Sequence, residues 1–445
     1  MFGWTDDGNE HQGQRVAIGA TLMCARWRNG YDPQLILAKV APSVSVSKEG
    51  NVTFGDFGYL QTYEPILVSA VEFCADIPES QKTAIVTTGI KEAVKAGNLT
   101  PDRVKKAMSR AEQDFLRKKT EDFVLATSMS FRKLPPFRKV TIGGQTIHLS
   151  KTLPRRFDRV SVEKRIPHFL PAPLPSDYIA LRVTTSGRTR EEAAERALAS
   201  LALLVGIWNF LLTYGSFSRS LMCSNGTGPI ADLRLGPLHT LHYPDGRIAT
   251  ETVWYEPTYA KPAPVKDYSD KFEKLRKNER WVLRQMSKAP EVERFRYAFM
   301  RYASAVDEPR LETAFLRFWS ILEHLTDTGK NSYDTTVRRS AFIFSDYLFA
   351  RQELQHLRDV RNGLVHLGES TNDPQAYVYQ IKQYVDGLLL FLLSDANVGR
   401  SRSEINELLD LPPGAEDLKR RTALHQRAVK FRVPGYGKKK RQTGR

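Results

Sequence analysis

The spacing of apolar residues changes along the chain, and it divides the sequence into a part with short strands and a part made of helices. In residues 15–75, short apolar or β-branched runs are separated by glycine, proline and asparagine, which is typical of strands joined by turns. Strands are predicted at 16–24, 35–40, 52–57 and 66–73.

Helices and further strands are expected between residues 100 and 256. The first helix spans about 100–120, with Thr100 as N-cap and Pro101 in the first helical position, where proline is tolerated. A longer helix at 189–214 begins at Thr189. Strands are predicted at 123–131, 178–184, 235–241 and 248–254, and a hairpin turns at Gly143 and Gly144.

After a proline-rich segment at 257–264, the strand signals almost vanish. Apolar residues at helical spacing predict helices at about 268–287, 291–305, 309–327, 333–350, 351–367 and 374–394, which together would form a bundle. The expected fold class is therefore α+β. It comprises a mixed α/β region at 1–256, a helical domain at 265–396 and a polar, basic tail at 397–445.

A soluble, cytoplasmic protein without a membrane partner is expected. The longest apolar run, 197–212, contains Ser200 and Asn209 and is shorter than the roughly 20 apolar residues of a membrane helix, so we expect a buried helix. The first residues are polar and acidic, unlike a secretory signal. Cys24, Cys74 and Cys223 lie far apart, which disfavours disulfides and a cysteine zinc site.

The charge balance indicates a polyanionic partner. The chain has 66 Lys and Arg against 50 Asp and Glu, a net charge of +16, and nucleic acid is the first candidate for such a protein. The tail ends in a basic cluster that includes Lys438, Lys439, Lys440 and Arg441. Its composition suits RNA binding, and it equally suits a tail that only improves solubility.

One segment of the predicted bundle combines the residue types of a ribonuclease site. An Arg followed five positions later by a His occurs four times in the chain, so that spacing alone identifies nothing. Arg361 and His366 differ from the other pairs because Asn362 follows the Arg directly and Gly368 could end the helix soon after the His. On a helix Asn362 and His366 share a face, and Arg361 is offset by about 140° from His366.

These residues suit RNA cleavage without a metal. A His with a pKa near neutrality can take the proton of a ribose 2′-hydroxyl or protonate the leaving 5′-oxygen. An Arg can hold the scissile phosphate and offset charge in the transition state, and an Asn can orient either group. The products would be a 2′,3′-cyclic phosphate and a 5′-hydroxyl.

The motif Arg361-Asn362-x-x-x-His366 on a late helix of an α-bundle resembles the hallmark of HEPN ribonucleases, in particular the Apea-like HEPN group of bacterial anti-phage and toxin systems. The resemblance covers roughly residues 290–395, including the helix that contains Glu323, and leaves 1–256 without a family. It implies that Arg361, Asn362 and His366 are catalytic, that no cofactor or metal is needed, and that two copies dimerise through this helix to complete one site.

Three neighbouring charges have two interpretations each. Glu323 either pairs with Arg361 across the bundle and sets its position, or it is an ordinary surface charge. Arg358 and Asp359, one turn before the motif, either form a local ion pair or extend the phosphate site.

Other chemistries find little support in the sequence. The chain has no Walker-type phosphate loop and no His-Glu-x-x-His metal helix. His239 and His242 lie three positions apart without a third ligand nearby, so a chance pair is the better interpretation than a zinc site.

The sequence therefore predicts an endoribonuclease that acts in anti-phage defence or growth arrest, with structured RNA such as tRNA as the substrate class that family precedent suggests. Residues 1–256 would recognise a trigger, such as a phage-derived molecule or a nucleotide, or restrain the nuclease. The alternative is a non-catalytic HEPN module that dimerises and binds RNA, a nucleotide or a partner. An antitoxin-like subunit of a nucleotidyltransferase pair is a weaker alternative, because the chain is large for that role.

Overall fold

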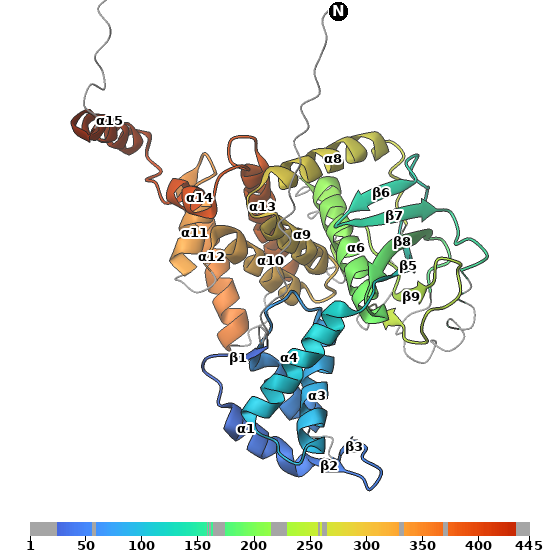
Figure 1. Ribbon diagram of the computed structural model, residues 1–445. Coiled ribbons are helices and arrows are strands. Elements are labelled where there is room, and N and C mark those ends of the chain that lie inside the picture. The colour runs from blue at the N-terminus through green and yellow to red at the C-terminus, as the bar shows by residue number, and fades with distance from the viewer. Residues whose placement is uncertain are drawn as a thin grey trace, which may run out of the picture. The chain divides into compact units, whose positions relative to one another are not determined.

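The computed structural model describes residues 25–55, 59–157, 159, 162, 174–214, 229–256, 259, 265–328, 333–367 and 373–432, with the side chains of 59, 60, 366 and 367 excepted. The chain divides into two compact units, Met1–Thr120 and Glu121–Arg445 (Figure 1). Strands occur towards the N-terminus and helices dominate towards the C-terminus, so the α+β fold class is confirmed.

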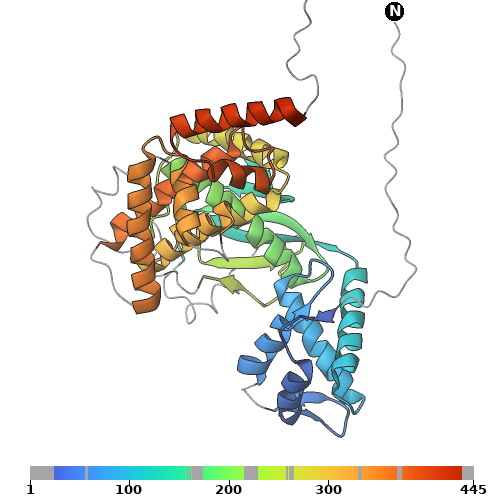
Figure 2. The same ribbon diagram turned by 90° about the vertical axis from the view of Figure 1, so that its left-hand side faces the viewer.

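The first unit is mostly helical, with two short antiparallel strand pairs, β1–β4 and β2–β3. Its elements are β1 (Arg26–Trp27), α1 (Pro33–Val40), η1 (Ala41–Ser43), β2 (Val44–Val46), β3 (Val52–Phe54), η2 (Tyr59–Tyr63), α2 (Glu64–Ser69), β4 (Val71–Glu72), α3 (Glu79–Lys95) and α4 (Pro101–Arg117). Helices α3 and α4 lie side by side (Figure 2). A Cβ atom on Gly89 of α3 would clash with Met108 of α4, so the glycine permits this close packing.

Two predictions for this unit are wrong. The runs 35–40 and 66–73 were predicted as strands, but 35–40 lies in α1, and 66–73 is helical as far as Ser69 in α2 and forms a strand only at Val71–Glu72. Short apolar runs fit either structure, and here Asp32 decides for helix, because its side chain accepts a hydrogen bond from the backbone N–H of Leu35 at 3.1 Å, with Pro33 next to it. Helix α3 was not predicted at all, whereas α4 is confirmed within three residues at its end.

The second unit begins with a six-stranded antiparallel sheet. Its strand order is β10-β9-β5-β8-β7-β6. The strands are β5 (Glu121–Met129), β6 (Lys139–Ile142), β7 (Gln145–Ser150), β8 (Ile179–Gly187), β9 (Leu238–His242) and β10 (Trp254–Tyr255). The predicted hairpin is confirmed between β6 and β7, where Gly143 and Gly144 both have positive φ, at 59° and 79°.

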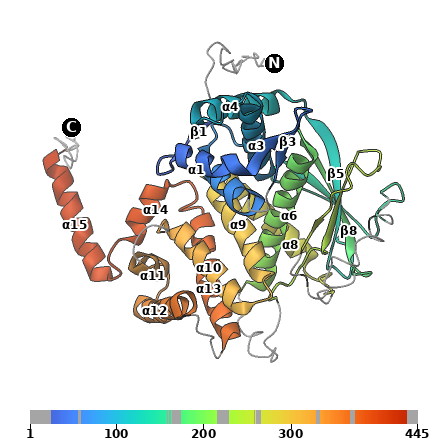
Figure 3. The ribbon, with the colours of Figure 1, turned by 90° about the horizontal axis from the view of Figure 1, so that it is seen from below.

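Helix α6 (Arg190–Thr213) is the central layer of this unit. It begins at Thr189, whose hydroxyl accepts a hydrogen bond from the Glu192 backbone N–H at 3.2 Å. One side of α6 contacts the sheet and the other contacts α9 (Figure 3). The helix is long and apolar enough to cross a membrane, but 72% of its most apolar window is buried, as expected for the core helix of a soluble protein.

The C-terminal part is helical, as predicted, with one boundary displaced. Its elements are α8 (Phe272–Lys288), α9 (Val292–Val306), α10 (Leu311–Thr326), α11 (Tyr333–Ala341), α12 (Tyr347–Asn362), η3 (Gly363–Leu367), α13 (Pro374–Leu393), α14 (Arg402–Leu409) and α15 (Ala415–Arg432). The break between α11 and α12 lies at 342–346 and not at 350, because the Asp346 side chain caps α12 by accepting from the backbone N–H of Phe349 at 3.1 Å. Two helices, α14 and α15, occupy the stretch predicted only as a polar tail.

The compact units do not follow the boundary that the sequence suggested at 257–264. The sheet and the helical bundle belong to one unit, and a single hydrophobic cluster includes Leu125 and Leu181 of the sheet, Trp208 of α6 and Phe318 of α10. The proline-rich segment therefore marks a change of secondary structure within one unit, because α6 gives the sheet and the helices a common core.

Candidate functional site

The predicted catalytic segment lies where α12 ends. Arg361 and Asn362 are the last two residues of α12, and the backbone continues through one π-helical turn, Gly363–Leu367, that contains His366. A π turn has hydrogen bonds between residues five apart, so it reduces the angle of about 140° that a regular α-helix would set between positions 361 and 366. Positions 361 and 366 are therefore closer around the axis than the sequence predicted.

Arg361 is held by an aromatic ring and by its neighbour. Its guanidinium carbon lies 4.5 Å from the centroid of the Tyr333 ring at the start of α11, and its Nη1 donates to Asn362 Oδ1 at 3.3 Å. Both Arg361 and Asn362 are half-buried. Within the described part of the chain Arg361 makes no ion pair, so most of its N–H donors remain available to an anion.

Glu323 reaches the Arg361 side chain only through two aromatic rings. Its Oε1 accepts a hydrogen bond from Trp319 Nε1 at 2.8 Å, and the Trp319 and Tyr333 ring centroids are 6.5 Å apart. No direct Glu323–Arg361 ion pair exists among the residues that the structure describes. The sequence prediction did not include Tyr333, because it lies on another helix and nothing in the motif spacing points to it.

Arg358 differs from Arg361 because its guanidinium group already forms ion pairs with two carboxylates. Its Nη1 lies 2.5 Å from Asp334 Oδ1 on α11, and its Nη2 lies 3.1 Å from Asp359 Oδ1. The structure thus contains the local Arg358–Asp359 ion pair that the sequence suggested, together with a second pair that links α12 to α11. Of these two neighbouring arginines, Arg361 is the one with open donors.

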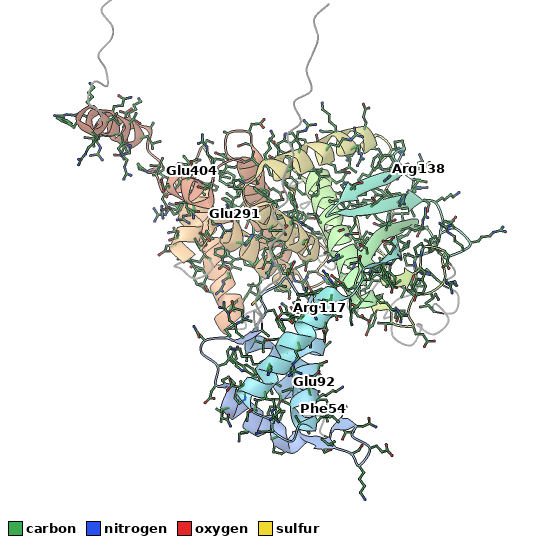
Figure 4. All side chains as sticks on the ribbon, in the orientation of Figure 1. Phe54, Glu92, Arg117, Arg138, Glu291 and Glu404 are labelled. Atoms are coloured by element: carbon green, nitrogen blue, oxygen red, sulfur yellow. The ribbon has the colours of Figure 1, made fainter. Side chains whose placement is uncertain are left out.

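A basic helix follows the bundle. Lys438, Lys439, Lys440 and Arg441 lie outside the described residues, but α15 is described and buries no side chain, and in Figure 4 its side chains project from all round the helix. Its acidic residues pair with Lys419 and Arg420 at 2.8 and 3.1 Å. Four cations of α15 have no ion-pair partner within the described chain: Arg421, Arg427, Lys430 and Arg432.

The two strand histidines have structural roles. His239 Nδ1 lies 2.8 Å from Thr127 Oγ1, and burial lowers the pKa of His239 to about 3. His242 Nδ1 lies 2.9 Å from the Gly246 carbonyl oxygen. No group of three His, Cys, Asp or Glu side chains suited to a metal ion occurs in the described ranges.

No family model, no curated protein and no solved structure matches this chain.

Proposed function

We propose that this protein is a metal-independent endoribonuclease of the HEPN type, with its active site at the junction of α12 and the π-helical turn. The observation that supports it most is the state of Arg361. Its guanidinium rests on Tyr333, is half-buried, has no carboxylate partner among the described residues, and lies five positions before His366 across a π turn. Single π turns are rare and are frequent at functional sites.

The proposed reaction is an in-line transesterification. The imidazole of His366 takes the proton from a ribose 2′-hydroxyl, the 2′-oxygen forms a bond to phosphorus, and the bond from phosphorus to the 5′-oxygen breaks. A proton returns to the leaving 5′-oxygen, which gives a 2′,3′-cyclic phosphate and a 5′-hydroxyl. Arg361 donates to the phosphate oxygens where negative charge develops, and Asn362 orients the phosphate or the imidazole.

We further propose a homodimer through α12. The reaction needs one group to take the 2′-hydroxyl proton and one to protonate the 5′-oxygen, and each copy supplies only one His366. Of the 16 residues of α12 only Ala350, Leu354 and Leu357 are buried, while Leu348 and Phe349 are 70% and 64% exposed. Exposed large apolar residues on a thinly packed helix favour a protein interface. Sedimentation of the wild type at twice the chain mass, and of Leu348→Asp at the monomer mass, would support this arrangement.

RNA is the proposed polyanion, held by the basic surface of the chain. The four unpaired cations of α15 and the net charge of +16 supply sequence-independent attraction to phosphates. In the cell the enzyme would act in the cytoplasm as a defence or growth-arrest effector. Residues 1–256 would sense the trigger, and structured RNA such as tRNA would be the substrate.

The second candidate is a non-catalytic HEPN module that binds RNA through the same residues. The N–H donors of Arg361 that are available to a phosphate, beside the Tyr333 ring, favour this alternative as well, because RNA binding needs them as much as catalysis does. Under this alternative His366 would contribute to affinity and not to bond cleavage.

A cleavage assay on total RNA in EDTA separates the candidates. His425 is a matched control for His366, because it also follows an arginine by five positions, and it is exposed on α15. We expect wild type and His425→Ala to leave 2′,3′-cyclic phosphate ends, and His366→Ala to leave none. Equal cutting by His366→Ala would refute the proposed site, and RNA binding by all three proteins without cutting would favour the binding module.

A further inference from the structure

A cavity of about 280 Å³ lies within the second unit, and no residue of α12 lines it. One wall is apolar and comes from α6 and α9, with Ala202, Val205 and Met300 among its residues. The other wall is charged and comes from the segments before β9, after β10 and after α9, and from α10. Cavities of this kind, with an apolar wall and a few convergent polar groups, are the usual form of small-molecule sites.

Two arginine–carboxylate pairs account for most of the charge in the cavity. Arg234, which is 5% exposed, pairs with Asp307, and its guanidinium carbon lies 4.6 Å from the centroid of the Tyr259 ring. Arg317 lies 2.6 Å from Glu308 and also donates to the Ser304 carbonyl oxygen at 2.7 Å. Both guanidinium groups are therefore held in place and neutralised by carboxylates of the protein.

Glu256 is the carboxylate that remains. Three carboxylates and two guanidinium groups line the cavity, so the lining has one negative charge in excess. Arg310, which is not part of the lining, also lies 3.7 Å from Glu308. Within the described part of the chain, neither oxygen of Glu256 has a hydrogen-bond or ion-pair partner. Glu256 is an exposed residue, and desolvation together with the Asp307 carboxylate raises its pKa, while Arg234 and Arg317 act in the opposite direction.

A bound cation would relieve this excess. The two oxygens of Glu256 can accept a bidentate pair of hydrogen bonds from a planar amidinium or guanidinium, or single bonds from an amine. The second oxygen of Asp307, Oδ2, faces no hydrogen-bond donor among the described residues and can accept another. A nucleotide suits the cavity poorly, because its phosphates would meet the excess negative charge.

We propose that this cavity is a binding site for a small organic monocation, whose amine, amidine or guanidine group contacts Glu256 and Asp307 and whose short apolar part packs against Val205 and Met300. This site is independent of the proposed nuclease activity, since none of its residues belongs to the segment around Arg361. It would give the protein a way to bind a metabolite-sized ligand in the same unit as that segment.

Titration calorimetry of the full chain with benzamidine tests the site. Benzamidine is a monocation with an aromatic ring, benzamide is its neutral analogue and benzoate is its anionic analogue. We expect benzamidine to bind the wild type, and benzamide and benzoate not to bind. Glu256→Gln should weaken benzamidine binding by roughly tenfold or more, because a charge-assisted hydrogen bond is lost.

Two further variants make the test specific. Glu273→Gln removes an exposed carboxylate of α8 outside the cavity and should bind benzamidine like the wild type. Ala202→Leu fills part of the cavity without changing its charge and should also weaken binding. Thermal melting of each variant confirms that it is folded. No benzamidine binding to the wild type, equal binding of benzamide, or unchanged affinity in folded Glu256→Gln and Ala202→Leu would overturn the proposal.

Discussion

Tyr333 should control the activity of the proposed nuclease through the position of Arg361. The guanidinium carbon of Arg361 lies 4.5 Å from the Tyr333 ring centroid, and the half-buried setting keeps water partly away from the pair. A cation–π contact of this kind contributes about 0.5–2 kcal/mol. If that energy holds Arg361 towards the phosphate in the transition state, Tyr333→Leu should lower kcat/KM by roughly 2- to 30-fold.

The comparison with Tyr333→Phe and with a second pair makes this prediction specific. Phenylalanine keeps the ring, so Tyr333→Phe should retain cleavage close to that of the wild type. Arg301 lies 4.5 Å over the Tyr297 ring on α9, which is the same distance, so Tyr297→Leu is a matched control and should not affect cleavage. Cleavage by folded Tyr333→Leu at the wild-type rate, or an equal loss in Tyr333→Phe, would refute this role of the ring.

Three other predictions follow from the fold and from α15. Changing the four unpaired cations of α15 to Gln should reduce the slope of log affinity against log salt by about 3 for single-stranded RNA, as measured by fluorescence anisotropy. Gly206→Ala should lower the free energy of unfolding by about 1–3 kcal/mol in urea, because the new Cβ would clash with the Phe299 carbonyl oxygen. His239 is buried with its pKa lowered to about 3, whereas the unfolded chain protonates it near pH 6.5. The stability from its neutral ring is therefore present above pH 6.5 and lost as the pH falls, by about 2 kcal/mol at pH 5, and urea titrations should show a flatter pH dependence in His239→Gln.

Long periodic patterns predicted the fold better than short ones. Helices α4, α6, α10 and α13 are confirmed, because each has enough turns for its apolar spacing to identify a helix. The run at 35–40 was mistaken for a strand, since a short, mostly apolar run fits both structures and a capping Asp32 decides between them. The common core of sheet and bundle was not predicted, because it depends on which elements α6 contacts and not on local sequence.

The candidate site was predictable only in its linear part. Arg361, Asn362 and His366 are neighbours in sequence, so their spacing could be read directly, and their catalytic role stays a prediction. Tyr333 comes from a different helix, so the motif spacing could not indicate it. The π turn could not be predicted either, because no residue type in the segment is specific for it. The cavity around Glu256 joins segments up to 115 positions apart, which no motif can bring together.

The position of α6 determines which fragments of the protein can fold independently. One face of this helix packs on the sheet and another on α9, with Gly206 pressed against the Phe299 backbone. Sheet and bundle should therefore melt in one cooperative transition, and a fragment that begins near residue 265 would expose the apolar surface that α6 covers. A truncation meant to isolate the helices should begin after Thr120, where the compact units divide, because a cut at the proline-rich segment would produce an aggregating fragment instead of a folded one.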